Sequence, residues 1–128
     1  MEVHFAPELF IPSGITDVSF YEKAFGAVEN FRFTNDDGGI HVVELSIGGQ
    51  LFHLHETGYN AAFEHPSETH KNTVCIGLFS DDPDSLFDSA IAAGAELIQP
   101  MTSHDYGYRQ GMLKDPFGHY WQVQKKID

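Results

Sequence analysis

The sequence predicts an α+β fold built from two βαβββ modules, which together form an open, cup-shaped mixed sheet. Three features of the 128 residues predict it. They are two amphipathic segments with helix-type ends, a series of segments in which apolar and polar residues alternate, and a weak internal repeat. We expect a single domain over residues 1–128, with module one at about 1–56, a linker at 57–72 and module two at about 73–128.

Two segments are predicted to be helices. The segment 82–94 begins with Asp82, a suitable N-cap, and Pro83, which fits the first helical turn, and a glycine ends it. The earlier segment from Ser13 to Gly26 follows the same plan, with Ser13 or Thr16 as its cap and an apolar residue at every third or fourth position. Each helix therefore presents one apolar face to a sheet.

The remaining segments alternate between apolar and polar residues, which is typical of strands with one buried face. Glycine and proline at Gly48-Gly49 and Asp115-Pro116-Phe117-Gly118 predict tight turns between neighbouring strands. The predicted strands cover residues 3–11, 28–34, 40–47, 50–56, 73–80, 96–103, 108–114 and 119–126.

An internal repeat relates the two halves. Gly26-Ala27 matches Gly94-Ala95 at an offset of 68, and Gly49–His55 matches Gly118–Gln124 at an offset of 69. In the longer pair, apolar residues fall on one face of the strand, and polar residues, His53 among them, fall on the other. A repeated sheet with one apolar and one polar face indicates a sheet curled around a cavity.

Composition excludes several classes of function. The chain has 7 Lys and Arg against 19 Asp and Glu, a net charge of −12, which repels nucleic-acid phosphates and anionic lipid. No apolar run is long enough to cross a bilayer. Cys75 is the single cysteine, so no disulfide forms within the chain, and we expect a cytoplasmic protein.

Several motifs resemble one known family. Ser19–Ala27 resembles the "FYxKxFGA" helix of the vicinal oxygen chelate superfamily, which contains the glyoxalases, bleomycin-resistance proteins and extradiol dioxygenases. Ala92–Ala95 and Asp115–Trp121 resemble its second half, and Ile40–Gly49 is most similar to its PhnB-like branch. The resemblance covers nearly the whole chain. It implies the glyoxalase/bleomycin-resistance fold, usually in a homodimer.

The resemblance also implies where a metal would lie. Metalloenzymes of this superfamily take one ligand from the first and last strands of each module. On this sequence those positions fall near Ala6, His53, Cys75 and Gln122. Only His53 is a strong ligand as it stands, and this departure argues against a glyoxalase-type metal centre.

The pair His53-x-His55 is the sharpest local signal for a site. Two residues apart on a strand, both rings project to the same side, about 6–7 Å apart along the backbone. With His4 or Glu8 from another strand they form a plausible set of ligands for one divalent ion, and Glu8 is the candidate catalytic residue because it can transfer a proton. Alternatively, the histidines hydrogen-bond each other, Gln122 or a substrate.

Further side chains are expected to contact a ligand. Strand alternation points the side chains of one face into the cavity. Aromatic residues beside an arginine are typical of a cavity rim that binds an aromatic or anionic molecule. Alternatively, Cys75 is a small buried side chain and Arg109 pairs with a surface carboxylate. The candidate substrate-binding residues are Phe10, Cys75, Phe79, Tyr108, Arg109, Tyr120 and Gln122.

Two classes of function stay open. The first is a metal-free protein that binds a small molecule in the cup, as bleomycin-resistance proteins do. The second is a metal-dependent enzyme of lyase, isomerase or dioxygenase type, with a divalent ion on a rebuilt histidine site. In either class we expect a small-molecule ligand and a homodimer, without nucleic acid or membrane as a partner. A purely structural role is disfavoured because inward polar side chains are costly in a core.

Overall fold

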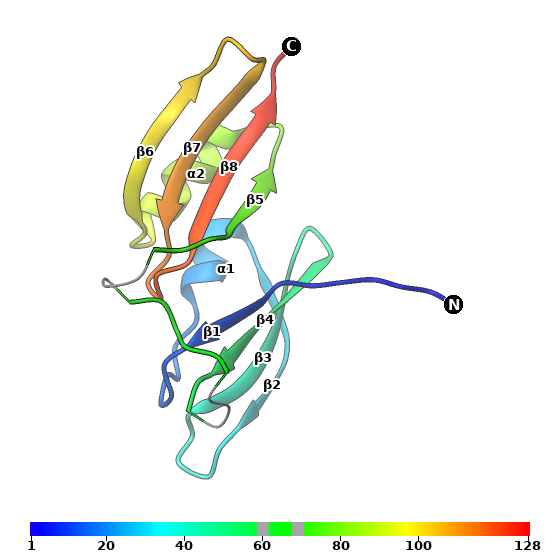
Figure 1. Ribbon diagram of the computed structural model, residues 1–128, viewed down its shortest axis with the longest axis vertical. Coiled ribbons are helices and arrows are strands. Elements are labelled where there is room, and N and C mark those ends of the chain that lie inside the picture. Colours follow the sequence, from blue (N-terminus) through cyan, green and yellow to red (C-terminus); the bar gives the residue numbers. More distant parts are fainter. Residues whose placement is uncertain (59–61, 68–70) are drawn as a thin grey trace.

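The computed structural model describes residues 1–58, 62–67 and 71–128 (Figure 1). Within these residues, two helices and eight strands follow one another in two similar halves. In chain order they are β1 (Glu8–Ile11), α1 (Phe20–Phe25), β2 (Val28–Thr34), β3 (Ile40–Ile47), β4 (Gln50–Glu56), β5 (Cys75–Phe79), α2 (Pro83–Ala92), β6 (Glu96–Ser103), β7 (Tyr108–Lys114) and β8 (Tyr120–Lys126).

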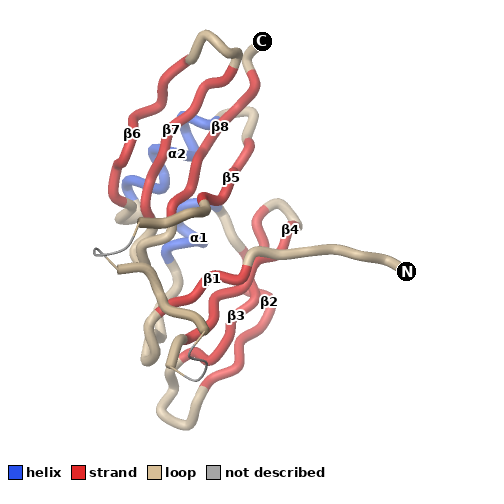
Figure 2. The backbone as a smooth tube through the Cα atoms, viewed as in Figure 1, coloured by secondary structure: helices blue, strands red, loops and turns tan. Residues whose placement is uncertain are grey.

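The strands form two sheets of four. Sheet one has the order β1-β4-β3-β2, and sheet two repeats it as β5-β8-β7-β6. In each sheet the first pair is parallel and the other two pairs are antiparallel. This confirms the predicted α+β class and its two modules. The hydrogen bonds nevertheless divide the strands between two sheets, which lie end to end with α1 near their junction (Figure 2).

The prediction for the first helix was wrong at its start. The helix was expected from Ser13, but α1 begins at Phe20. Gly14 has a φ of 91°, and the backbone N–H of Ser19 donates to the side chain of Asp17 at 2.9 Å, so the chain turns before the helix. Its end at Gly26, with a φ of 69°, is as predicted.

The second helix was predicted well. The Asp82 side chain accepts a hydrogen bond from the backbone N–H of Ser85 at 3.2 Å, as an N-cap should, and Pro83 begins α2. The first strand is shorter than predicted. Residues 3–7 form no ladder, and Pro7, which has no N–H to donate, immediately precedes β1.

One hydrophobic core joins the two modules. Tyr21 and Phe25 of α1 pack against Trp121 of β8, with ring centroids 5.9 Å and 4.9 Å apart. The Tyr21 hydroxyl donates to buried Asp115 at 2.6 Å, and the Trp121 indole N–H donates to the same carboxylate at 2.9 Å. The continuous cluster of buried residues therefore draws on both sheets.

Each sheet has a covered face and an open face. In β7, for example, Gly111 and Leu113 are buried toward α2, whereas Gln110 and Met112 point to the other side and are half-buried. We call that other side the open face. Exposed apolar side chains at open-face positions are Val28, Phe31, Phe33 and Phe79. Among the residues that the structure describes, no helix is both long and apolar enough to cross a membrane.

Candidate functional site

A row of charged side chains crosses the open face of sheet one. Glu8 on β1 and Glu44 on β3 both stand opposite His53 on β4 in the strand register. His53 Nδ1 lies 2.6 Å from Glu8 Oε2, and His53 Nε2 lies 3.0 Å from Glu44 Oε1. The register thus places Glu8, rather than Ala6, against His53. The sequence reasoning missed Glu44, because only the β3–β4 register identifies it.

This row favours the protonated form of His53. Both ring nitrogens face carboxylates, so a ring with a proton on each nitrogen can donate to Glu8 and to Glu44 at once. Partial burial acts against the charge, but hydrogen bonds to Glu44 and Glu8 outweigh it and raise the pKa of His53 above its usual 6.5. Hydrogen bonds from His53 and Asn30 lower the pKa of Glu44. The row therefore carries a net negative charge.

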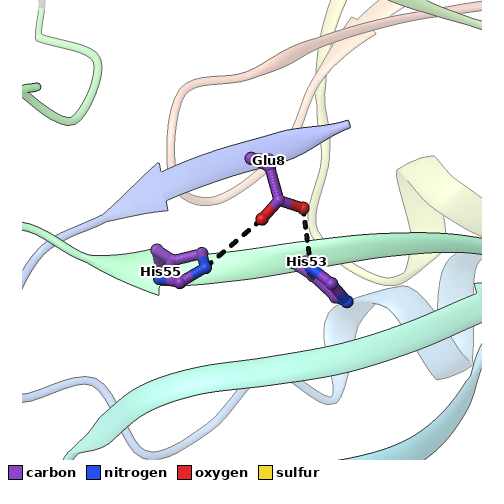
Figure 3. A group of neighbouring side chains, drawn as sticks. All are labelled: Glu8, His53 and His55. Atoms are coloured by element: carbon purple, nitrogen blue, oxygen red, sulfur yellow. Dashed lines mark ion pairs between the residues drawn. The ribbon is translucent and has the colours of Figure 1, made fainter. Parts of the chain in front are cut away.

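His55 extends the row toward a metal-type cluster. Its Nε2 lies 3.4 Å from Glu8 Oε1, so one carboxylate bridges both histidines (Figure 3). Ligand atoms of Glu8, His53 and His55 all lie within 4.8 Å of one another. Two imidazoles and a carboxylate fit a divalent ion such as Zn²⁺, provided that His53 loses its proton. The structure does not bring His4 into this group: it lies in residues 1–7, ahead of β1.

Aromatic rings adjoin this cluster. Phe10, opposite His55 in the β1–β4 register, has its ring centroid 5.8 Å from that of His55. The Phe63 ring from the linker stacks on Phe10 at 4.5 Å with an interplanar angle of 8°. Phe10, a predicted ligand contact, therefore stands between the imidazole and a second aromatic ring.

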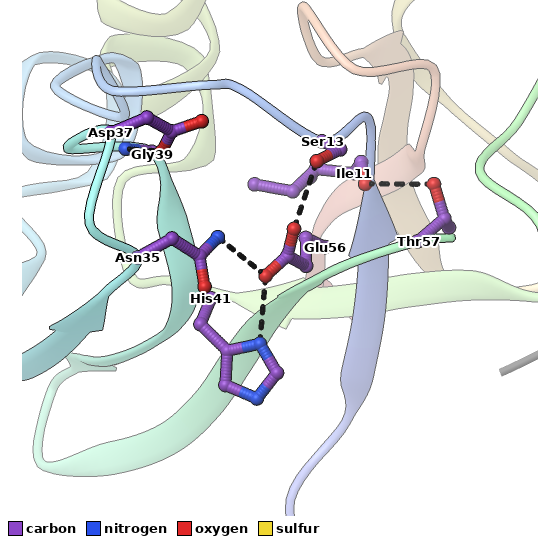
Figure 4. Close-up of polar contacts among 8 residues, drawn as sticks. All are labelled: Ile11, Ser13, Asn35, Asp37, Gly39, His41, Glu56 and Thr57. Carbon is purple, nitrogen blue, oxygen red and sulfur yellow. Dashed lines mark hydrogen bonds and ion pairs between the residues drawn. The ribbon is translucent and has the colours of Figure 1, made fainter. Parts of the chain in front are cut away.

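A second polar cluster lies around Glu56 at the end of β4. Its carboxylate is 8% exposed and accepts hydrogen bonds from Ser13 at 2.9 Å and Asn35 at 2.8 Å, and it lies 2.7 Å from His41 Nδ1 (Figure 4). The Asn35 and His41 hydrogen bonds lower the pKa of Glu56. Sequence reasoning missed the Glu56 cluster. Glu56 follows Leu54 on the apolar face of the predicted strand, and a glutamate at such a position could have indicated a buried, paired carboxylate.

Sheet two carries other predicted ligand contacts. Cys75 and Tyr120 are register partners that line a hollow of about 1210 Å³ between the open face and the linker, together with Met112 and Lys114. Lys114 Nζ stands 5.8 Å from the Tyr120 ring centroid. Cys75 is exposed, so the interpretation of a small buried cysteine was wrong. Cys75 also shares a separate cleft of about 720 Å³ with His4.

The other sheet-two candidates divide between the two faces. Phe79 and Gln122 point to the open face, in line with Cys75 and Tyr120 along their strands. Tyr108 begins β7 on the same side. For Arg109 the structure agrees with the alternative of pairing with a surface carboxylate, because strand alternation puts its side chain on the covered face. There its guanidinium donates twice to Asp84 of α2, each time at 2.7 Å.

Comparisons with known proteins extend over most of the chain. An uncharacterised protein of Mycobacterium bovis is 29% identical over 133 residues, which cover 99% of this chain and 86% of that protein. TioX from Micromonospora sp. ML1 is 25% identical with a TM-score of 0.70, covering 98% of this chain and 100% of that one.

A glyoxalase/bleomycin resistance protein/dioxygenase family enzyme from Burkholderia phytofirmans PsJN shares the fold. Its TM-score is 0.74 at 23% identity, covering 94% of this chain and 95% of that one. The sequence profile of the same superfamily matches residues 13–123. The chain therefore belongs to the Glyoxalase/Bleomycin resistance protein/Dioxygenase superfamily.

Proposed function

We propose that this protein binds a small molecule against the open face of sheet two. The hollow beside Cys75 and Tyr120 carries the proposal, because it is large enough for a drug-sized ligand and joins apolar, aromatic and polar side chains. Superfamily members bind small molecules and usually form dimers. With Arg109 paired on the covered face, the support for an anionic ligand is lost, and an uncharged or cationic ligand suits this acidic chain better.

We further propose that a second copy of the chain completes the site. The open face of sheet one carries Glu8 and Glu44, whereas the open face of sheet two carries Lys126 and a Lys114 that pairs with Glu96 at 3.7 Å. Two acidic sheet-one faces therefore repel each other, and the sheet-one face of one copy is attracted to the sheet-two face of the other. Such pairing would also cover the exposed open-face phenylalanines. Light scattering should give a mass of about twice 14.3 kDa, and a monomer across all concentrations would contradict the proposal.

The lone cysteine offers a direct test of ligand binding. We expect a bound ligand to slow the reaction of exposed Cys75 with a chromogenic disulfide reagent, since the thiol lines the hollow. A panel of planar aromatic and cationic compounds would be screened with a chelator present. The control is Cys75→Ser, which must abolish the signal. If no compound slows labelling or raises the melting temperature, the binding proposal fails.

A metal-dependent enzyme is the second candidate, and the Glu8, His53 and His55 cluster favours it. These three residues would hold the ion, and a divalent ion there would supply Lewis-acid chemistry. Equilibrium dialysis should find about one Zn²⁺, Mn²⁺, Ni²⁺ or Fe²⁺ per chain, and His53→Gln should remove it. Stoichiometry unchanged in His53→Gln, or no binding of any of these ions, would contradict this candidate.

Two finer assignments complete the proposal. Placement in the PhnB-like branch is supported by the strand and Gly-Gly turn at Ile40–Gly49. A cytoplasmic location is supported by the exposed thiol of Cys75, which a reducing compartment keeps intact. A phylogenetic tree of the superfamily tests the first, and imaging of a tagged chain in its own cell tests the second.

A further inference from the structure

Three glutamines on the open face of sheet two form a hydrogen-bonded chain. Gln124 Oε1 accepts from Gln110 Nε2 at 2.9 Å and from Gln122 Nε2 at 3.0 Å. The Tyr106 hydroxyl donates to Gln110 Oε1 at 2.6 Å. This network of hydrogen bonds thus holds the side-chain amides of Gln122 and Gln124 next to each other.

Two polar atoms at the end of this glutamine network have no hydrogen-bond partner. Among the described residues, neither Gln124 Nε2 nor Gln122 Oε1 has a hydrogen-bond partner, although Gln124 is only 7% exposed. Rotating each of the three side-chain amides by 180° exchanges its nitrogen and oxygen. Every donor then becomes an acceptor and every acceptor a donor, and the same hydrogen bonds remain. In either arrangement the pair offers one free donor and one free acceptor. Among the described residues every buried side-chain polar atom has a partner, so these two free atoms reach solvent and are accessible to a ligand.

The neighbouring strand leaves this pair uncovered. Gly77 on β5 stands opposite Gln122, and a Cβ there would lie 3.1 Å from Gln124 Nε2 and 3.5 Å from Phe79 Cε1. Any side chain at position 77 would therefore crowd the amide, and glycine keeps it accessible. Phe79, 66% exposed, flanks the opening and presents an aromatic face.

The charge of the surroundings narrows the class of ligand. The open-face positions of β7 and β8 carry Lys114 and Lys126, but Lys114 forms a 3.7 Å ion pair with Glu96, its register partner on β6. A ligand carboxylate would also set two acceptors against one donor and one acceptor, so it fits poorly. A lactam or primary carboxamide, which has a donor beside an acceptor, matches both free atoms.

We propose that Gln122 and Gln124 bind the lactam or carboxamide edge of a planar, uncharged ring that stacks on Phe79. This inference rests on the proposed binding of a small molecule to the open face of sheet two, and it names the chemical class of that molecule. The glutamine pair and Phe79 lie on that face beyond the residues that line the hollow at Cys75 and Tyr120. Gln110 and Tyr106 are positioning residues, since they hold the amide of Gln124 without touching the ligand. Gly77 provides the space.

The test uses 2-quinolone, a planar bicyclic lactam, titrated into the full-length protein by calorimetry. N-methyl-2-quinolone, in which the donor is blocked, should bind about tenfold more weakly or worse, because one free acceptor is left without a partner. Gln124→Met and Gly77→Ala should each weaken 2-quinolone binding by about tenfold. Gln50→Met, the same chemical change on sheet one, should leave the affinity unchanged.

The outcomes separate this inference from the proposal on which it rests. The comparison of the two quinolones uses the unaltered chain, so a folding defect in a variant does not affect it. Equal affinity for both quinolones would overturn the inference, as would absence of 2-quinolone binding while other compounds protect Cys75 from labelling. If no compound at all protects Cys75, the proposed function fails as well.

Discussion

Replacement of Glu56 by glutamine tests whether the carboxylate at the end of β4 stabilises the fold through its charge. In Glu56→Gln the new NH₂ group can donate to Ser13, whose hydroxyl then accepts, and the remaining oxygen still faces Asn35 and His41. The contacts survive, but all three hydrogen bonds lose the charged carboxylate. At about 1 kcal/mol each, the variant should lose about 3 kcal/mol of unfolding free energy at pH 7.

The stability difference between the natural chain and Glu56→Gln should also depend on pH. The pKa of Glu56 in the folded chain is lowered from 4.5 by the hydrogen bonds from Asn35 and His41. Its contribution is therefore complete above the unfolded pKa and disappears as the pH falls through the folded pKa. The difference between Glu56 and glutamine should accordingly shrink as the solution is acidified below pH 4.5.

Urea unfolding, followed by the fluorescence of Trp121, measures both effects, since it is the only tryptophan and is buried in the core. Glu96→Gln is a matched control, because Glu96 forms only a 3.7 Å ion pair at the surface and should change stability by less than about 0.5 kcal/mol. Stability of Glu56→Gln equal to that of the natural chain at neutral pH would refute the reasoning. A deficit of the same size at acidic pH would also refute it.

Two substitutions and one titration probe the core and the charged row. Tyr21→Phe removes one donor from Asp115, which keeps its other donors, and should cost about 1–2 kcal/mol in urea unfolding; no loss would show the bond to be unimportant. Gly111→Ala would place a Cβ 2.6 Å from Met101 Sδ and should lower the melting temperature through overpacking worth about 1–3 kcal/mol, whereas an unchanged temperature would mean that Met101 moves away freely. The ring of His53 should titrate in NMR with a midpoint above 6.5, and a lower midpoint would contradict its pairing with carboxylates.

Periodicity predicted the elements well because apolar and polar faces alternate along most of the chain. It failed at Ser13–Ser19, where apolar residues at helical spacing coexist with the turn at Gly14 and the side-chain contact of Asp17. It also failed at residues 3–7, which alternate like a strand but lie outside the ladder; the structure gives this segment one backbone hydrogen bond to a strand, from His53 N–H to the Pro7 carbonyl at 2.9 Å. Tertiary pairing overrides local pattern in both places.

The candidate site was predictable where it depends on alternation within one strand. His53 and His55 were placed together for that reason, and Gln122 was assigned to the correct face. Glu44 was missed because its position opposite His53 depends on strand register. For Arg109 two interpretations were open, and buried Leu113, four residues later in β7 and on the same face, was a signal in favour of pairing with a carboxylate on the covered face.

The contact of α1 with Trp121 has a consequence for how the chain folds. Residues 1–72 contain α1 but not the β8 residues against which its aromatic side chains pack, so that fragment would expose part of its own core. The two halves, similar as they are, should not be autonomous folding units. We expect one cooperative unfolding transition, with calorimetric and van't Hoff enthalpies that agree, in place of two separate meltings. In that case the ancestral half-unit that the repeat suggests would have needed a second copy of itself before it could fold.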